Sequence, residues 1–260
     1  MDMRAEVWSP LQNASIWLGA WLFGLESTDE LIDALTDLGG YQTLEDGRPL
    51  IDLLSSIRSE VGHLPGNSAG EPLLRLVLSG PGEPPALPAS SPAFQAAAKS
   101  LAGAIIVKTA QADRHLVLVP TALSGEGGHA GTGWQLFVET GPLPAPAWLS
   151  PGDADFLLAR ATEESAAWIE KMDYVKKDTP SPRLQVGSLA DFYENPGLPA
   201  ATPVRSEKLF SRADRVAAII ETVTDRLDDH YLDPQLLRLW RHIRQARMAG
   251  VAYALTEFAR

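Results

Sequence analysis

The sequence predicts an α+β fold, in which a small mixed, mainly antiparallel sheet of about four strands is covered by N-terminal and C-terminal helices. Helix-forming patterns fill both ends of the 260-residue chain, and the middle holds short runs rich in valine, isoleucine, leucine and aromatic residues. Glycine and proline separate these runs. The 45% hydrophobic and 21% charged residues are typical of a globular protein that can bury a core.

Three helices are predicted in the first 62 residues. Ser9-Pro10 places a capping serine before a proline that suits the first helical position, and Gly24 can end this helix. Ser27-Thr28-Asp29-Glu30 has the spacing of a capping box, so a second helix begins there. A third helix is expected over residues 48–61, where leucine and isoleucine recur at spacings of three and four.

Four strands are expected in the middle of the chain, because four short runs there are rich in β-forming residues. They are Leu73–Ser79, Ala104–Lys108, Leu116–Pro120 and Trp134–Thr140. A short helix over Ala93–Leu101 separates the first two, so a strand–helix–strand crossover is expected before a meander. This crossover is the reason for predicting a mixed sheet.

Helices dominate the rest of the chain. One is predicted from Ser150 to Tyr174, and two more, over 211–230 and 233–260, are expected to form an antiparallel hairpin. We divide the chain into an N-terminal helical segment (1–62), an α/β core (63–174), a proline-rich connector (175–203) and a C-terminal helical hairpin (204–260). We expect these parts to form one compact unit.

Composition excludes several function classes. The chain has no cysteine, which removes disulfides, thiolate metal sites and cysteine nucleophiles. Its net charge of −11 and its lack of a helix-turn-helix, zinc-finger or RNA-binding aromatic strand make nucleic acid a poor partner. The most apolar segment, Ala14–Leu25, is shorter than the roughly 20 residues that span a bilayer, and it lacks the flanks of a secretory signal. We therefore expect a cytoplasmic protein with no membrane span.

The first predicted strand is followed by Gly80-Pro81-Gly82-Glu83-Pro84-Pro85, which superficially resembles a nucleotide-binding loop. Such loops bind phosphate through backbone amides at the start of a helix, and three of these six residues are prolines without an amide hydrogen. We interpret the segment as a structural turn.

A glycine-rich loop over residues 124–133 is the candidate ligand site. It contains five glycines, so its backbone could close over a ligand or form a flexible hairpin. Glu126 and His129 are the residues in it that could act as an acid–base pair or as ligand contacts. No metal ligand set with recognisable spacing and no cofactor motif occurs in the sequence.

The last predicted helix combines a broad apolar face with a row of arginines. The candidate interaction surface consists of Arg238, Arg241, Arg244 and Arg247. These arginines could pair with the acidic N-terminal segment, which has 3 basic and 11 acidic residues over positions 1–62. They could instead bind an acidic protein partner.

Several segments resemble an uncharacterised family of actinobacterial conserved hypothetical proteins. The resemblance covers roughly residues 70–260 and is carried by Leu76-Val77-Leu78, Gly80-Pro81-Gly82, Pro85-Ala86-Leu87-Pro88, Phe94-Gln95-Ala96-Ala97-Ala98, Val117-Leu118-Val119-Pro120, Arg212-Ala213 and Leu237-Arg238. It implies an actinobacterial source and a similar arrangement of elements. It implies no activity, cofactor or catalytic residue.

These observations favour a non-catalytic protein-interaction or regulatory module, with a protein partner or self-association. The alternative is a small-molecule-binding protein or enzyme with its site at the loop 124–133. The sequence does not decide whether the protein is an enzyme.

Overall fold

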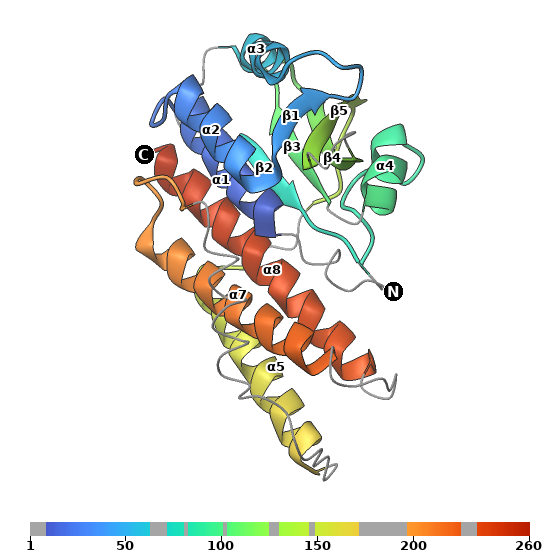
Figure 1. Ribbon diagram of the computed structural model, residues 1–260, viewed down its shortest axis with the longest axis vertical. Helices are drawn as coiled ribbons and strands as arrows, with labels where there is room; N and C mark the ends of the chain where they lie inside the picture. The colour runs from blue at the N-terminus through green and yellow to red at the C-terminus, as the bar shows by residue number, and fades with distance from the viewer. Residues whose placement is uncertain are drawn as a thin grey trace.

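The computed structural model describes residues 9–62, 72–80, 83–100, 103–124, 130–145, 149–171, 197–224 and 233–260. A five-stranded sheet with helices around it forms one end of the molecule, and long helices extend from it (Figure 1). The predicted α+β class is confirmed.

The three N-terminal helices form where the sequence predicts them. They are α1 (Ser9–Leu22), α2 (Thr28–Gly39) and α3 (Leu50–Val61). The predicted capping box is present at the start of α2, where the Glu30 N–H donates to Ser27 Oγ at 3.1 Å and the Ser27 N–H donates to Glu30 Oε2 at 2.9 Å. These two bonds satisfy amides that have no partner within the helix.

The four predicted strands are present and form an antiparallel series in chain order. They are β2 (Leu74–Val77), β3 (Ala104–Lys108), β4 (Arg114–Ser124) and β5 (Ala130–Thr140). Helix α4 (Pro92–Ser100) lies between β2 and β3 in the chain, yet these two strands pair antiparallel. The expected crossover to a parallel neighbour is therefore wrong, and α4 serves as a long connection within an antiparallel pair.

A fifth strand, β1 (Tyr41–Leu44), was not predicted, and it makes the sheet mixed because it pairs in parallel with β5. Its four residues follow α2 directly and contain no strong β pattern. Contacts distant in the chain hold it in place: the Gln42 side chain donates to the Leu35 carbonyl at 2.7 Å and accepts from Trp134 Nε1 at 2.8 Å. The local sequence pattern does not predict tertiary hydrogen bonds of this kind.

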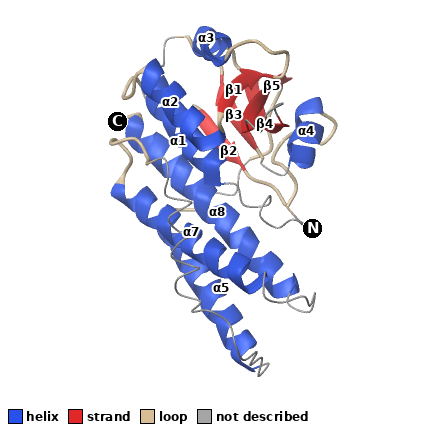
Figure 2. Ribbon diagram, in the orientation of Figure 1, coloured by secondary structure: helices blue, strands red, loops and turns tan. Residues whose placement is uncertain are grey.

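The sheet order is β1-β5-β4-β3-β2, and helices cover both of its faces (Figure 2). Strand alternation sends one set of side chains into a large core with α1, α2, α3 and the C-terminal half of α8 (Asp233–Phe258). That set includes Leu74, Leu76, Ile105, Val107, Leu116 and Leu118. The opposite set packs against α4 through Ala93 and Ala97.

The remaining described residues form mainly three long helices: α5 (Pro151–Lys171), α7 (Val204–Thr224) and α8. Helices α7 and α8 run antiparallel, as predicted, because Ser206 Oγ near the start of α7 donates to the Gly250 carbonyl near the end of α8 (Figure 1). The start of α7 at Val204 is seven residues before the predicted one at 211. Helix α8 contributes to the sheet core and to the core between α5 and α7, so it joins the two parts.

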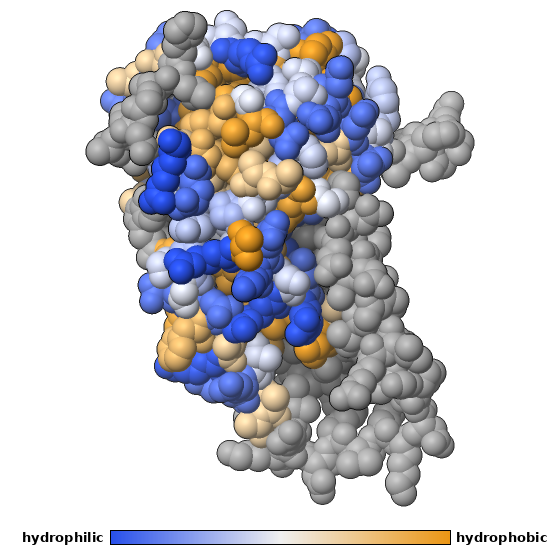
Figure 3. Space-filling model, turned by 90° about the vertical axis from the view of Figure 1, so that its left-hand side faces the viewer, coloured by the Kyte–Doolittle hydropathy of each residue, from blue (hydrophilic) through white to orange (hydrophobic). Residues whose placement is uncertain are grey.

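One side of the molecule is shown in Figure 3, where hydrophobic side chains gather in the upper half, at the height of α1 and α2. Leu25, which follows α1, is an exposed large hydrophobic residue. Within the described ranges, no helix has both the length and the apolar character needed to cross a bilayer.

Candidate functional site

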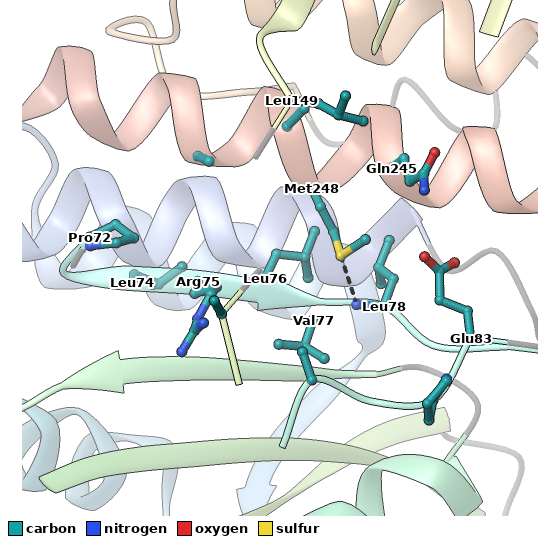
Figure 4. Close-up of a pocket in the computed structure, with 15 residues that line it drawn as sticks. Pro72, Leu74, Arg75, Leu76, Val77, Leu78, Glu83, Leu149, Gln245 and Met248 are labelled. Carbon is teal, nitrogen blue, oxygen red and sulfur yellow. Dashed lines mark hydrogen bonds between the residues drawn. The ribbon is translucent and has the colours of Figure 1, made fainter. Parts of the chain in front are cut away.

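A crevice of about 130 Å³ lies between the edge strand β2 and α8 (Figure 4). Its floor is residues 74–78, and Gln245, Met248, Ala249 and Ala252 line it from α8. Pro72, Glu83, Pro84, Ala86, Ala145 and Leu149 complete its lining. We call this space the β2–α8 crevice.

The floor of the crevice exposes main-chain groups of an edge strand. Because the Lys108 N–H donates to the Leu73 carbonyl at 2.8 Å, Leu73 directs its main-chain groups toward β3. In an antiparallel pair alternate residues point the opposite way, so Leu76 and Leu78 direct theirs away from β3. The Leu78 N–H is indeed bonded to Met248 Sδ, at 3.4 Å (Figure 4). No described residue outside the sheet bonds to the main chain of Leu76.

Polar side chains gather at one end of the crevice. Glu83 and Gln245 lie there, on the turn that follows β2 and on α8 (Figure 4). Glu83 Oε2 accepts from Arg244 Nε at 3.2 Å, and the Glu83 side chain is 22% exposed whereas that of Arg244 is 1% exposed. The other end of the floor holds Arg75, whose Nη1 donates to the Pro144 carbonyl at 3.0 Å.

A second buried arginine of α8 connects three helices. Arg247 is fully buried and donates from Nη1 to Gln12 Oε1 of α1 at 2.7 Å. Its Nη2 lies 2.7 Å from Asp214 Oδ1 of α7, an ion pair by distance whose angle is not that of a hydrogen bond. Gln12 in turn donates to Asn13 Oδ1 at 2.9 Å. This network balances a cation that would be costly to bury alone.

His242 lies one helical turn before the crevice, on the side of α8 that faces α5. Burial, with the neighbouring charges of Arg238 and Arg241, lowers the pKa of His242 below its ordinary value, and Glu164 opposes this shift. The side chain of Gln245, which lines the crevice, also opposes the shift and raises the pKa of His242. The neutral imidazole is therefore the favoured form at neutral pH.

The arginines proposed from the sequence are divided between surface and interior. Arg238 and Arg241 are exposed, and Arg238 Nη1 lies 3.6 Å from Glu164 Oε2 of α5. Arg244 and Arg247 are buried, because with Trp240, Ile243 and Val251 they follow the three-and-four spacing of the inward face of α8. Arg244 pairs with Glu83, and Arg247 pairs with Asp214 and Gln12. None of these three partners is an acidic residue of the first 62 positions.

Glu126 and His129, the candidate ligand residues, lie outside the described residues. The structure does describe the strands on either side, which continue further than predicted: β4 extends to Ser124 and β5 begins at Ala130. Gly131 and Gly133 thus belong to a strand rather than a loop. A role for Glu126 and His129 stays a prediction.

Sequence reasoning missed the residues that form the crevice. Glu83 occurs in a proline-rich turn, and Gln245 and Met248 have no distinctive spacing, so no motif identifies them. The helical period of α8 was the available signal, because it places Arg244 on the same face as apolar core residues. A cation on such a face requires a buried partner.

The lining of the crevice combines apolar walls with a few hydrogen-bonding groups. Its lining is mainly aliphatic, with main-chain and side-chain hydrogen-bonding groups at the floor and at one end. In the part of the chain that the structure describes, no group of three or more histidine, aspartate or glutamate side chains could hold a metal ion.

Comparisons with known proteins identify the family. A model described as "Rv1486c-like protein, N-terminal domain" matches residues 12–148, and one described as "Rv1486c-like protein, C-terminal domain" matches residues 152–248. The chain belongs to the Rv1486c-like family. The boundary between the two family domains falls just before α5.

Two relatives in this family come from Mycobacterium tuberculosis, which agrees with the resemblance to actinobacterial proteins. They are "Uncharacterized protein MT1533" of strain CDC 1551 / Oshkosh and "Uncharacterized protein Rv1486c" of strain ATCC 25618 / H37Rv. Each is 26% identical over 289 aligned residues, which cover 96% of this chain and 98% of the relative. No solved structure matches the chain significantly.

Both family domains contribute to the crevice. Strand β2 and the turn with Glu83 lie in the N-terminal domain, and Gln245 and Met248 lie in the C-terminal domain. The site is therefore formed between the two domains of the family.

Proposed function

We propose that the protein is a non-catalytic protein-interaction module, whose β2–α8 crevice accepts one apolar anchor side chain from a partner protein. The single observation that carries this proposal is the crevice itself, with its size and its lining. The proposed location is the cytosol. A chain without cysteine has no disulfide that this reducing compartment could break.

The size of the crevice favours a side chain over a cofactor. Pockets for cofactors and drug-sized molecules usually enclose about 300–1,000 Å³. The 130 Å³ available here is closer to the roughly 150 Å³ apolar cavity that holds a single benzene ring. One leucine, methionine or phenylalanine side chain is an occupant of that scale.

The chemistry of the walls supports the same occupant. Met248 is a flexible, polarisable side chain that can adapt to different apolar groups. Leu149 and the alanines at 249 and 252 add apolar surface that a large side chain would remove from water. A buried anchor in a pocket of this kind typically dominates the energy of a protein interface.

Main-chain groups on the floor would bind the backbone next to the anchor. The N–H and C=O of Leu76 point away from β3, and a partner strand could bond to them as it does at the edges of other sheets. This arrangement would fix the direction of the partner segment as well as its anchor.

Filling the crevice tests the proposal. Phage-displayed random heptapeptides would be selected on the wild-type protein and then measured against Ala252→Leu, which adds a side chain inside the crevice. We expect the selected peptides to share one large apolar residue and to lose at least tenfold in affinity for Ala252→Leu, because the added leucine occupies the anchor position.

The matched control is Ala166→Leu, the same change at an exposed position of α5. This variant should bind the selected peptides as the wild type does. Failure to select any peptide, or equal affinity for Ala252→Leu and Ala166→Leu, would contradict the proposal.

A further inference from the structure

A buried arginine beside the crevice has unused hydrogen-bonding capacity. The guanidinium of Arg244 bonds to Glu83 through Nε, and its buried Nη1 and Nη2 have no hydrogen-bond partner among the residues that the structure describes. A guanidinium carries five N–H donors, and most buried donors in proteins are paired. Nε and Nη2 form one edge of the guanidinium, and such an edge can bind a carboxylate through two parallel hydrogen bonds.

The turn that follows β2 is shaped around this guanidinium. Gly80 and Glu83 exchange two main-chain hydrogen bonds of 2.9 Å, which close the turn. A Cβ at position 80 would lie 2.7 Å from Cζ of Arg244, so only glycine allows the main chain to approach the guanidinium this closely. The same turn carries Glu83, which lines the crevice and bonds to Arg244.

We propose that Arg244 binds the C-terminal carboxylate of the partner, so that the anchor in the crevice is the last residue of the partner chain. This inference rests on the proposed function of the crevice. A C-terminal residue offers an apolar side chain and a carboxylate on the same carbon atom, and the crevice and Arg244 meet at Glu83.

In the free protein, the Glu83 carboxylate binds the guanidinium of Arg244 where the partner's carboxylate would bind. Its bond is a single contact of 3.2 Å, longer than a typical charge-assisted bond, and its side chain is partly exposed. The entering carboxylate would displace Glu83 toward solvent and bond to Nε and Nη2 of Arg244, the edge at which Glu83 makes its single bond. Glu83 therefore acts as an internal competitor that weakens partner binding.

Two small probes separate the carboxylate from the anchor side chain. N-acetyl-leucine carries the free carboxylate, and N-acetyl-leucinamide carries the same side chain with a neutral amide. We expect the acid to bind the wild-type protein at least tenfold more tightly than the amide, as measured by NMR titration, because a hydrogen bond to a charged group exceeds a neutral one.

Two variants assign this preference to the named residues. In Glu83→Gln the preference for the acid should increase, because a neutral side chain competes less for the guanidinium. In Arg244→Gln the preference should disappear while the amide still binds. If Arg244→Gln fails to fold, Glu83→Gln decides, and an unchanged or smaller preference in that variant overturns the inference.

The outcomes distinguish this inference from the function on which it rests. Equal binding of acid and amide to the wild type overturns the role of Arg244 and leaves the anchor crevice standing. Absence of binding by both probes counts against the crevice, and the inference fails with it.

Discussion

Replacing Asp214 with alanine should reduce the free energy of unfolding by about 3 to 5 kcal/mol, the usual cost of leaving one member of a buried ion pair alone. Arg247 is fully buried and lies 2.7 Å from Asp214, which is itself almost completely buried. Gln12 would still accept from Arg247, but it carries no charge to balance the cation. Urea denaturation followed by circular dichroism measures the loss.

The control for this variant is Asp155→Ala, which removes an ion pair between α5 and α7. The Arg212–Asp155 contact has a similar length, 3.0 Å, but both side chains are nearly half exposed. Its loss should cost no more than about 1 kcal/mol, because water screens exposed charges. Equal costs for the two variants would show that Asp214 does not balance a buried charge.

Replacing Gly103 with alanine should destabilise the protein by about 3 kcal/mol or more. Gly103 immediately precedes β3 and has a φ of 88°, a conformation that residues with a side chain rarely adopt. A Cβ at this position would also overlap the carbonyl oxygen of Val77 in the neighbouring strand. Relief of this overlap would push β3 away from β2, the floor of the crevice. Thermal denaturation measures the effect.

Gly24→Ala separates the two causes. Gly24 has a φ of 73°, and no atom lies within 4 Å of the position of its missing Cβ. This variant should lose only the roughly 1 to 2 kcal/mol of backbone strain. If both glycine variants lose the same stability, the close approach of β3 to Val77 contributes nothing.

The sequence determined most of the fold through local signals. Ser27 and Glu30 identified the start of α2 because a capping box is a short-range device, and the valine- and leucine-rich runs identified β2 to β5. Strand β1 and the antiparallel pairing of β2 with β3 depend on contacts between distant parts of the chain. Local patterns carry no information about such contacts.

The site was less predictable than the fold. The arginines of α8 were recognised as a group, but their division into exposed Arg238 and Arg241 and buried Arg244 and Arg247 depends on what each side of the helix contacts. Glu83 gains its importance from Arg244, which follows it by 161 residues. A single sequence cannot reveal this pair.

Helix α8 connects the buried Arg247 network with the crevice. On the buried face of α8, Arg247 contacts Gln12 of α1 and Asp214 of α7. Arg244, three residues earlier in the chain, contacts Glu83 in the turn after β2. Met248 and Ala252 then line the crevice one turn apart. A partner bound in the crevice would therefore contact the helix that connects the sheet to the helical part of the molecule.

The most direct measurement is an NMR titration of the protein labelled with ¹³C at the methionine methyl groups. Met248 lines the crevice and bonds to the Leu78 amide, so its methyl signal reports on the anchor position. N-acetyl-leucinamide supplies an anchor side chain without the carboxylate that concerns Arg244. We expect a saturable shift of the Met248 signal in the wild type and in Ala166→Leu, and none in Ala252→Leu. An unchanged Met248 signal in the wild type, or an equal shift in Ala252→Leu, would contradict this expectation.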